Sequence, residues 1–161
     1  MRGPVTDGNI VISDLRAVPH FADAIADRVW RAWWKPKGFA LEHVAGLVRE
    51  NLGSGPLPLA IVAHRGSTFI GTASIIASDM EERPQYTPWV AAVWVDPAFR
   101  RQGVGGIIVG HAARAAFAAG ADTAYLCAVP AKSAFYQGLG WSLREQDVGD
   151  HRLDVFTLKP I

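Results

Sequence analysis

The chain has 161 residues, of which 50% are hydrophobic and 19% charged, and its formal net charge is +1. This length and composition predict one globular domain over residues 1–161 and exclude a disordered or fibrous chain. The balanced charge argues against nucleic-acid and membrane-surface partners, which need a basic patch, and the lone Cys127 excludes an internal disulfide and favours a reducing compartment.

The N-terminal part of the chain predicts an edge strand followed by two helices. Residues 1–8 contain no signal-peptide run, and no apolar run is long enough to span a bilayer, so we expect a cytoplasmic protein. Residues 9–16 contain three consecutive β-branched residues and predict the edge strand. A helix is expected from about 19 to 33, because apolar residues recur at a spacing of four: Phe21, Ile25, Val29 and Trp33. That spacing places Trp33 in the core. In the second helix, Leu41, Val44 and Val48 are expected to face inward.

The rest of the chain alternates strands with helices. A hairpin of strands is expected at 59–64 and 68–76, then a polar loop over 79–88 and an apolar strand over 89–95. A helix that ends near Gly120, a strand at 123–128, a short helix at 130–137 and a closing hairpin at 141–143 and 151–158 follow. This order predicts one mixed sheet with helices on both faces.

The stretch 89–106 predicts a phosphate-binding turn, because an apolar strand leads into a basic, glycine-rich turn and then a helix. Gly103 and Gly105 lack a Cβ atom, so the backbone can approach a phosphate closely, and the amides from 101 to 106 can form a concave nest. An ordinary glycine turn with solvated arginines is the alternative, and a glycine pattern alone does not exclude it.

Two common nucleotide-binding patterns fail at particular residues. A Walker-type loop needs Gly-Lys-Ser/Thr after its glycines, whereas Gly106 and Ile107 follow Gly105 in this chain. A dinucleotide fingerprint needs a glycine three residues after its second one, and that position is Ile108.

The remaining pattern, Arg100-x-x-Gly103-x-Gly105 after Val95-Asp96-Pro97, resembles the turn that holds the pyrophosphate of acetyl-coenzyme A in the GNAT superfamily of N-acetyltransferases. The segment 134–141 looks like the aromatic-Tyr-x-x-x-Gly-aromatic segment of the same family. The resemblance implies a single-domain α/β fold with a mixed, mostly antiparallel central sheet flanked by helices on both faces. It also implies acetyl-CoA as cosubstrate, an amine substrate, no metal and, since family members often pair, a possible homodimer.

The resemblance assigns cofactor binding to the central strand and the turn. Backbone groups of the strand would pair with the pantetheine arm and stabilise the developing oxyanion, although a fully paired structural strand is the alternative. The cofactor-binding residues so implied are Val93, Trp94, Val95, Arg100, Arg101, Gln102, Gly103, Val104, Gly105 and Gly106.

Tyr136 matches the family's tyrosine acid, which protonates the departing thiolate. A phenol of pKa about 10 faces a thiol of about 8.5, so a hydrogen bond to the thiolate is as reasonable as full proton transfer. The alternative for Tyr136 is a packing role under Trp141.

A base is needed because an alkylammonium of pKa about 10.4 is rarely neutral at pH 7. The family's glutamate position is about Ala124 here and its asparagine position is Val129, so both groups are missing. The remaining candidates are acidic residues of the loop before the central strand: Asp79, Glu81 and Glu82. We take Glu82 as the catalytic candidate, and a solvated acidic loop is the alternative.

In the family, the junction of the first two helices and the loop before the central strand line the acceptor site. The matching residues are Trp33, Trp34, Lys35, Lys37 and the loop 79–86, with a core place for Trp33 and solvated lysines as the alternative. Cys127 is expected to be a buried strand residue with no base beside it. The sequence thus predicts an N-acetyltransferase that acts on a primary amine of a small molecule or peptide. A non-catalytic acyl-CoA-binding sensor or regulatory module is the alternative.

Overall fold

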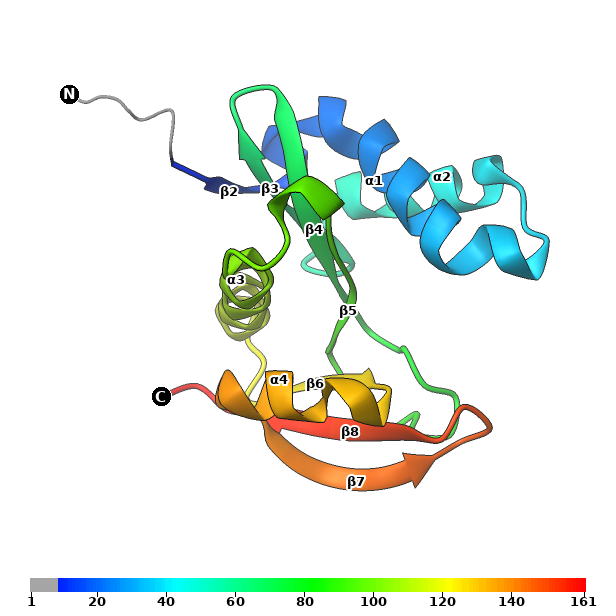
Figure 1. Cartoon of the computed structure of the whole chain (residues 1–161), viewed down its shortest axis with the longest axis vertical. Coiled ribbons are helices and arrows are strands. Elements are labelled where there is room, and N and C mark those ends of the chain that lie inside the picture. The colour runs from blue at the N-terminus through cyan, green and yellow to red at the C-terminus, as the bar shows by residue number, and fades with distance from the viewer. Residues whose placement is uncertain (1–8) are drawn as a thin grey trace.

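The computed structural model describes residues 9–161, so the first eight residues, on which the expectation of no signal peptide rests, lie outside it. Its centre is a seven-stranded sheet with the order β2-β3-β4-β5-β6-β8-β7 (Figure 1). Every neighbouring pair is antiparallel except β5 and β6, which are parallel. The mixed, mostly antiparallel sheet predicted from the sequence is therefore confirmed.

The strands follow the apolar runs of the sequence, and β2 lies at the sheet edge as predicted. Their bounds are β2 Val11–Asp14, β3 Leu59–Arg65, β4 Thr68–Ile76, β5 Trp89–Val95, β6 Ala124–Ala128, β7 Ser142–Val148 and β8 Leu153–Leu158. Strand β7 is longer than the predicted 141–143. The sequence underestimates its length because β7 is an irregular edge strand. Its register with β8 shifts on both sides of Glu145, and most of its side chains are exposed, which hides the alternation that marks a strand.

In residues 9–161, four α-helices cover the sheet, and short 3₁₀ turns connect them to the strands. The α-helices are α1 Ala22–Val29, α2 Leu41–Arg49, α3 Val104–Ala118 and α4 Ser133–Gly138. The 3₁₀ turns are Leu15–Ala17, Pro19–Phe21, Lys35–Lys37, Glu50–Leu52, Pro97–Phe99 and Pro130–Lys132. None of the helices in the described part of the chain is long and apolar enough to cross a membrane.

The helix predicted from 19 to 33 is interrupted. Helix α1 ends at Val29 and continues as a π-helical turn over Trp30–Trp34. A π-helical turn holds more residues than an α-helical one and so rotates the following side chains out of phase. As a result Trp33 is 40% exposed, and its predicted place in the core is wrong. Leu41, also predicted to face inward, is 37% exposed at the start of α2.

Helices cover both faces of the sheet, as Figure 1 shows. Alternate side chains of β3 serve the two layers: Leu59 and Ile61 pack in the core beneath α3, and Ala60 and Val62 pack against α1 and α2. Because side chains of a strand point alternately to opposite faces, an unbroken apolar run such as β3 needs a cover on each side.

The sheet opens between β5 and β6. These strands are paired only at Trp89 and Tyr125, whereas β5 continues along β4 to the pairing of Val95 with Gly71. Within β5, Ala92 has a φ of +53° next to a shift in the β4 register, a bulge that bends the strand. We call the resulting opening between β5 and β6 the splay.

Candidate functional site

The turn that follows β5 exposes the backbone at the start of α3. Arg101 and Gly103 have positive φ angles of +63° and +80°, and Gly103 is the N-cap of α3 without a side-chain hydrogen bond to the helix. The first amides of a helix have no partner within it, and no side chain replaces that partner here. The turn therefore offers backbone N–H groups at the positive end of a 15-residue helix, which suits an anion such as phosphate.

The two arginines of the turn have different places. Arg100 donates from Nε to the carbonyl of Val95 at 2.7 Å, and its guanidinium lies 4.6 Å from the ring centroid of Trp94. It therefore fastens the turn to its own strand, while Arg101 and Gln102 are exposed. Arg100 is exposed as well, so both arginines can bring positive charge to the turn.

The start of α3 packs closely against α4. A Cβ atom on Gly106 would lie 3.0 Å from Leu139 Cδ2, and one on Gly105 would lie 3.5 Å from the Phe135 ring. Small residues allow this approach, which keeps the turn beside α4. The side chain of Val104 is buried, so only its backbone can serve a ligand.

The predicted backbone partners of the pantetheine arm lie along the splay. Trp94 and Val95 pair with Thr72 and Gly71 of β4, and the other edge of β5 faces the opening. The side chains of Val93, Trp94 and Val95 are half-buried. One edge of this strand is therefore held by the sheet and the other is available to a ligand.

Tyr136 lies on α4 and packs against the core beneath α3. Its carbonyl accepts hydrogen bonds from the amides of Leu139 at 3.0 Å and Trp141 at 3.1 Å, so its backbone is fixed while its half-buried ring lies 5.9 Å from that of Phe156. Burial, and secondly the nearby Cys127, raise the pKa of Tyr136 above its ordinary value. Its hydroxyl therefore stays protonated at neutral pH and can donate a hydrogen bond.

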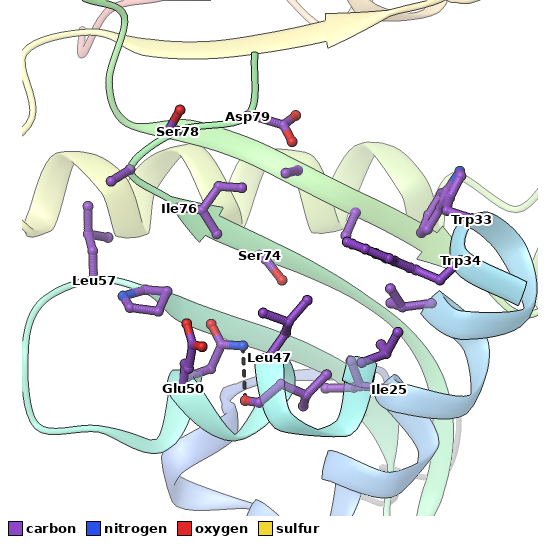
Figure 2. Close-up of a pocket in the computed structure, with 18 of the residues that line it drawn as sticks. Ile25, Trp33, Trp34, Leu47, Glu50, Leu57, Ser74, Ile76, Ser78 and Asp79 are labelled. Atoms are coloured by element: carbon purple, nitrogen blue, oxygen red, sulfur yellow. Dashed lines mark hydrogen bonds between the residues drawn. The ribbon is translucent and has the colours of Figure 1, made fainter. Parts of the chain in front are cut away.

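A pocket of about 800 Å³ lies on the opposite face of the sheet, between α1, α2 and strands β4 and β5 (Figure 2). It reaches the splay, because Ala91 and Ala92 of β5 and Cys127 of β6 all line it. The other lining residues are Ile25, Val29, Trp33, Trp34, Lys37, Val44, Leu47, Val48, Glu50, Asn51, Leu57, Pro58, Ser74, Ile76, Ala77, Ser78, Asp79 and Leu153. Of the predicted acceptor residues, Trp33, Trp34, Lys37 and Asp79 are brought together at the pocket, whereas Lys35 lies over the ring of Trp30.

Asp79 and Cys127 meet at the point where the pocket reaches the splay. Cys127 Sγ lies 3.5 Å from Asp79 Oδ2 and donates to it. Burial and then the carboxylate raise the pKa of Cys127 to about 12, so the thiol is neutral and a poor nucleophile. Withdrawal from bulk water raises the pKa of Asp79, partly offset by the thiol hydrogen bond. Cys127 lies on a strand as predicted, but it is half-buried and has an acidic neighbour that sequence reasoning missed.

Glu82 lies outside the pocket lining. Its side chain is exposed and sits against the turn between β7 and β8, where a Cβ atom on Gly149 would lie 2.7 Å from Glu82 Oε2. Glu81 is also exposed and does not line the pocket. Of the three acidic candidates in this loop, the structure brings only Asp79 to the splay.

The loop that carries Asp79 is fastened to β7 by a polar network. Arg83 Nη2 donates to Glu145 Oε1 at 2.6 Å, and the Tyr86 hydroxyl donates to Glu145 Oε2. Arg144 Nε donates to the Tyr86 hydroxyl at 3.0 Å, and the Tyr86 ring stacks on Tyr125 at 4.5 Å. Arg83 and then Tyr86 lower the pKa of Glu145 to about 2. The network holds the loop in place beside the splay.

Comparison with known proteins gives one family match and many similar folds. A model described as "Acetyltransferase (GNAT) family" matches residues 24–141, while no curated protein matches the chain. The solved structure of yncA from Salmonella typhimurium with its cofactor acetyl-CoA has a TM-score of 0.69 and 16% identity over 94% of each chain. An acetyltransferase of the GNAT family from Streptococcus pneumoniae has a TM-score of 0.69 and 13% identity, over 94% of this chain and 99% of that one.

An aminoglycoside 6'-N-acetyltransferase complexed with coenzyme A is similar in fold as well. Its TM-score is 0.71 and its identity 17%, over 92% of this chain and 96% of that one. At these identities the likeness concerns the fold.

Proposed function

Because the chain belongs to the GNAT family of acetyltransferases and is an acetyl-CoA-dependent acyltransferase, we propose that it acetylates the nitrogen of a primary amine by direct attack. One observation carries this proposal: the anion-binding turn and the pocket lie on opposite faces of the sheet, and the splay connects them. An amine in the pocket can therefore reach an acyl group held along β5.

The turn and strand suit acetyl-CoA for reasons of shape. Gly103, with its φ of +80°, has no atom within 4 Å of the place its Cβ would occupy, so the backbone there is open to a bulky anion. When bound, acetyl-CoA supplies an acyl carbon that is activated by its thioester bond. The backbone groups of Val93 to Val95 that face the splay would bind the pantetheine arm, and an N–H among them would stabilise charge on the carbonyl oxygen.

Tyr136 is the proposed acid. As the new C–N bond forms and the C–S bond breaks, its hydroxyl would donate a hydrogen bond to the departing thiolate sulfur, and the proton lost by the attacking nitrogen would pass to the base. Since burial raises the pKa of Tyr136, transfer to a thiolate of pKa about 8.5 is uphill. Stabilisation of the thiolate by the hydrogen bond is therefore the larger part of its role.

Asp79 is the proposed base, in place of Glu82, which the sequence favoured. A base must be within hydrogen-bond reach of the amine or one water molecule away from it. Asp79 lines the pocket at the splay, whereas Glu82 lies by Gly149. A carboxylate with a raised pKa accepts the proton of an ammonium more readily than an ordinary one, and it also attracts the cation before reaction. Glu82 remains the comparison residue for the test.

We also propose that residues 1–161 form one domain and that the protein works in the cytoplasm. The free thiol of Cys127 suits a reducing compartment. The homodimer stays a prediction.

The test is an assay of released CoA thiol with a panel of amines, run on the wild type and on Tyr136→Phe. We expect kcat to fall by about a hundredfold or more in the variant, with no change in Kd for acetyl-CoA measured by calorimetry. Tyr125→Phe is a matched control outside the proposed reaction and should keep the wild-type rate. A fully active Tyr136→Phe variant would show that the tyrosine is not the acid.

A further inference from the structure

The pocket has walls that are mainly apolar. Helices α1 and α2 contribute Ile25, Val44 and Leu47, and strands β4 and β5 contribute Ile76 and Ala91. Its volume of about 800 Å³ lies within the range of sites that enclose a drug-sized molecule. A ligand that fills it must therefore bring apolar surface, since a strongly polar body would lose its hydration without replacement hydrogen bonds.

Two tryptophans form a fixed aromatic wall at one end of the pocket (Figure 2). Trp33 meets the ring of Trp94 edge-on at 6.2 Å, and Trp34 meets Phe39 edge-on at 5.0 Å. These ring contacts hold both indoles before any ligand arrives. Flat, fixed indole faces favour a flat apolar partner, because aromatic pairs gain more than the burial of their area alone.

The charge of the pocket suits a single ammonium group. Within the described part of the chain, the charged lining residues are Lys37, Glu50 and Asp79. Glu50 lies across the pocket from Asp79 in Figure 2, and Lys37 adds a positive charge, so these three side chains together carry a net charge of −1, which one ammonium group balances. Only Asp79 lies at the splay, where acetyl transfer would occur. A polycation would have to bury further charges against apolar walls, which is costly without partners.

We propose that the acceptor is a primary monoamine with an apolar, ring-bearing body, whose ammonium lies at Asp79 and whose ring lies among Leu47, Trp33 and Trp34. This substrate class rests on the proposed amine acetylation. It also differs from the aminoglycosides on which one structural neighbour is named, because those are polycationic and strongly polar.

The test compares three probes in the thiol-release assay: 2-phenylethylamine, the diamine putrescine and the aminoglycoside kanamycin. We expect kcat/KM for 2-phenylethylamine to exceed that for either polycation by at least about tenfold, a modest expectation for one buried ring. An equal or higher value for putrescine or kanamycin would overturn the substrate class while leaving amine acetylation intact.

A pair of variants on α2 assigns the effect to the pocket. Leu47 lines the pocket and Leu41 does not, yet both are 37% exposed, so either position should accept a charged side chain without unfolding. Leu47→Glu should lower kcat/KM for 2-phenylethylamine at least about tenfold, by placing a charge beside the ring. It should also reduce the ratio of kcat/KM for 2-phenylethylamine to kcat/KM for putrescine. Leu41→Glu should match the wild type. Equal behaviour of the two variants would overturn the assignment.

Binding without turnover separates the two proposals. We would titrate 2-phenylethylamine into the protein with coenzyme A present, by calorimetry. If the amine binds, loses affinity in Leu47→Glu and yet is not acetylated by the wild type, amine acetylation fails and the pocket's ligand class stands. If it neither binds nor reacts, the ligand class is overturned.

Discussion

The two faces of the sheet present two different kinds of site. On the α3 face, the turn after β5 is built from backbone: the positive φ of Arg101 and Gly103, and the first amides of α3. On the α1–α2 face, the pocket is built from side chains that come from helices, strands and a loop far apart in the sequence. The first site requires a chain conformation, and the second requires particular residues.

This difference determines how each site selects its ligand. A site made of amides binds what every member of a family shares, because a phosphate accepts hydrogen bonds from any backbone of the right shape. A site made of side chains can change its ligand by a few substitutions on a fixed frame. We therefore expect substitutions on the α3 face to act through conformation and those on the α1–α2 face to act through chemistry.

The strongest way to break the backbone-built site is Gly103→Val. A β-branched residue is strained at a φ of +80°, and its side chain would enter the proposed phosphate position. Strain and lost anion contacts together should weaken the binding of acetyl-CoA by roughly 3–4 kcal/mol, or several hundredfold in Kd. Calorimetric titration of acetyl-CoA measures this loss.

Gly120→Val supplies the control for strain alone. Gly120 has a φ of +105° and open space around its Cβ position, but it lies just beyond the other end of α3. This variant should lose thermal stability and keep the wild-type Kd. If Gly120→Val weakened the binding of acetyl-CoA as much as Gly103→Val does, the loss of affinity would come from a less stable helix and not from the turn.

A smaller, chemical effect is expected from Asp79→Asn on the pocket side. Asp79 is exposed by area, but the chain packed around its carboxyl group partly desolvates it and raises its pKa, so the carboxylate that accepts a proton is lost as the pH falls through this raised value. The variant should lose about a hundredfold in kcat with an amine substrate, and the acidic limb of its pH–rate profile should disappear. Its Kd for acetyl-CoA should not change.

Glu82→Gln is the matched comparison from the same loop, and it should retain both the rate and the acidic limb. The opposite result, with Glu82→Gln inactive and Asp79→Asn active, would return the role of base to Glu82.

The smallest predicted effect is a change in the free energy of unfolding, and it concerns the loop that carries Asp79. The pKa of Glu145 is lowered to about 2 from an ordinary 4.5, so its contribution to stability is present above pH 4.5 and is lost as the pH falls towards 2. Since Arg83 and Glu145 are partly exposed (27% each), solvent screening limits the loss in Glu145→Gln to about 1 kcal/mol at pH 7. Urea unfolding at several pH values measures this difference, which should vanish near pH 2.

Asp147→Asn serves as the control for that measurement. Asp147 lies on the same strand as Glu145, but its ion pair with Arg152 is mostly exposed, so the loss of this pair should hardly change the unfolding free energy. The Glu145 variant should also raise KM for the amine more than KM for acetyl-CoA, because the loop borders the pocket.

Much of the α3 face could be predicted from the sequence because its signals are local. The strand 89–95, the glycine turn and the helix after it follow one another directly, and each is specified by residues within a few positions. The same holds for the hairpin of β3 and β4, whose apolar runs are separated by a short turn. The spacing of apolar residues predicts a helix or a strand well when that element keeps one regular period from end to end.

The α1–α2 face could not be predicted in this way. A π-helical turn moved Trp33 out of the register of its helix, and no local residue pattern announces such a turn. The contact of Asp79 with Cys127 joins positions 48 residues apart, and only the folded sheet brings them together. Glu82 and Asp79 look alike in sequence, and the structure separates them by the path of one loop.

The splay also divides the backbone amides of β5 into two sets that should exchange their hydrogens at different rates. Those directed towards β4 are paired with it on both sides of the bulge at Ala92, and those on the other edge, beyond the pairing of Trp89 with Tyr125, face the opening. Deuterium should therefore replace hydrogen slowly at one set and quickly at the other, alternating from residue to residue on each side of the bulge. An acyl chain hydrogen-bonded in the splay would slow the faster set and erase the alternation.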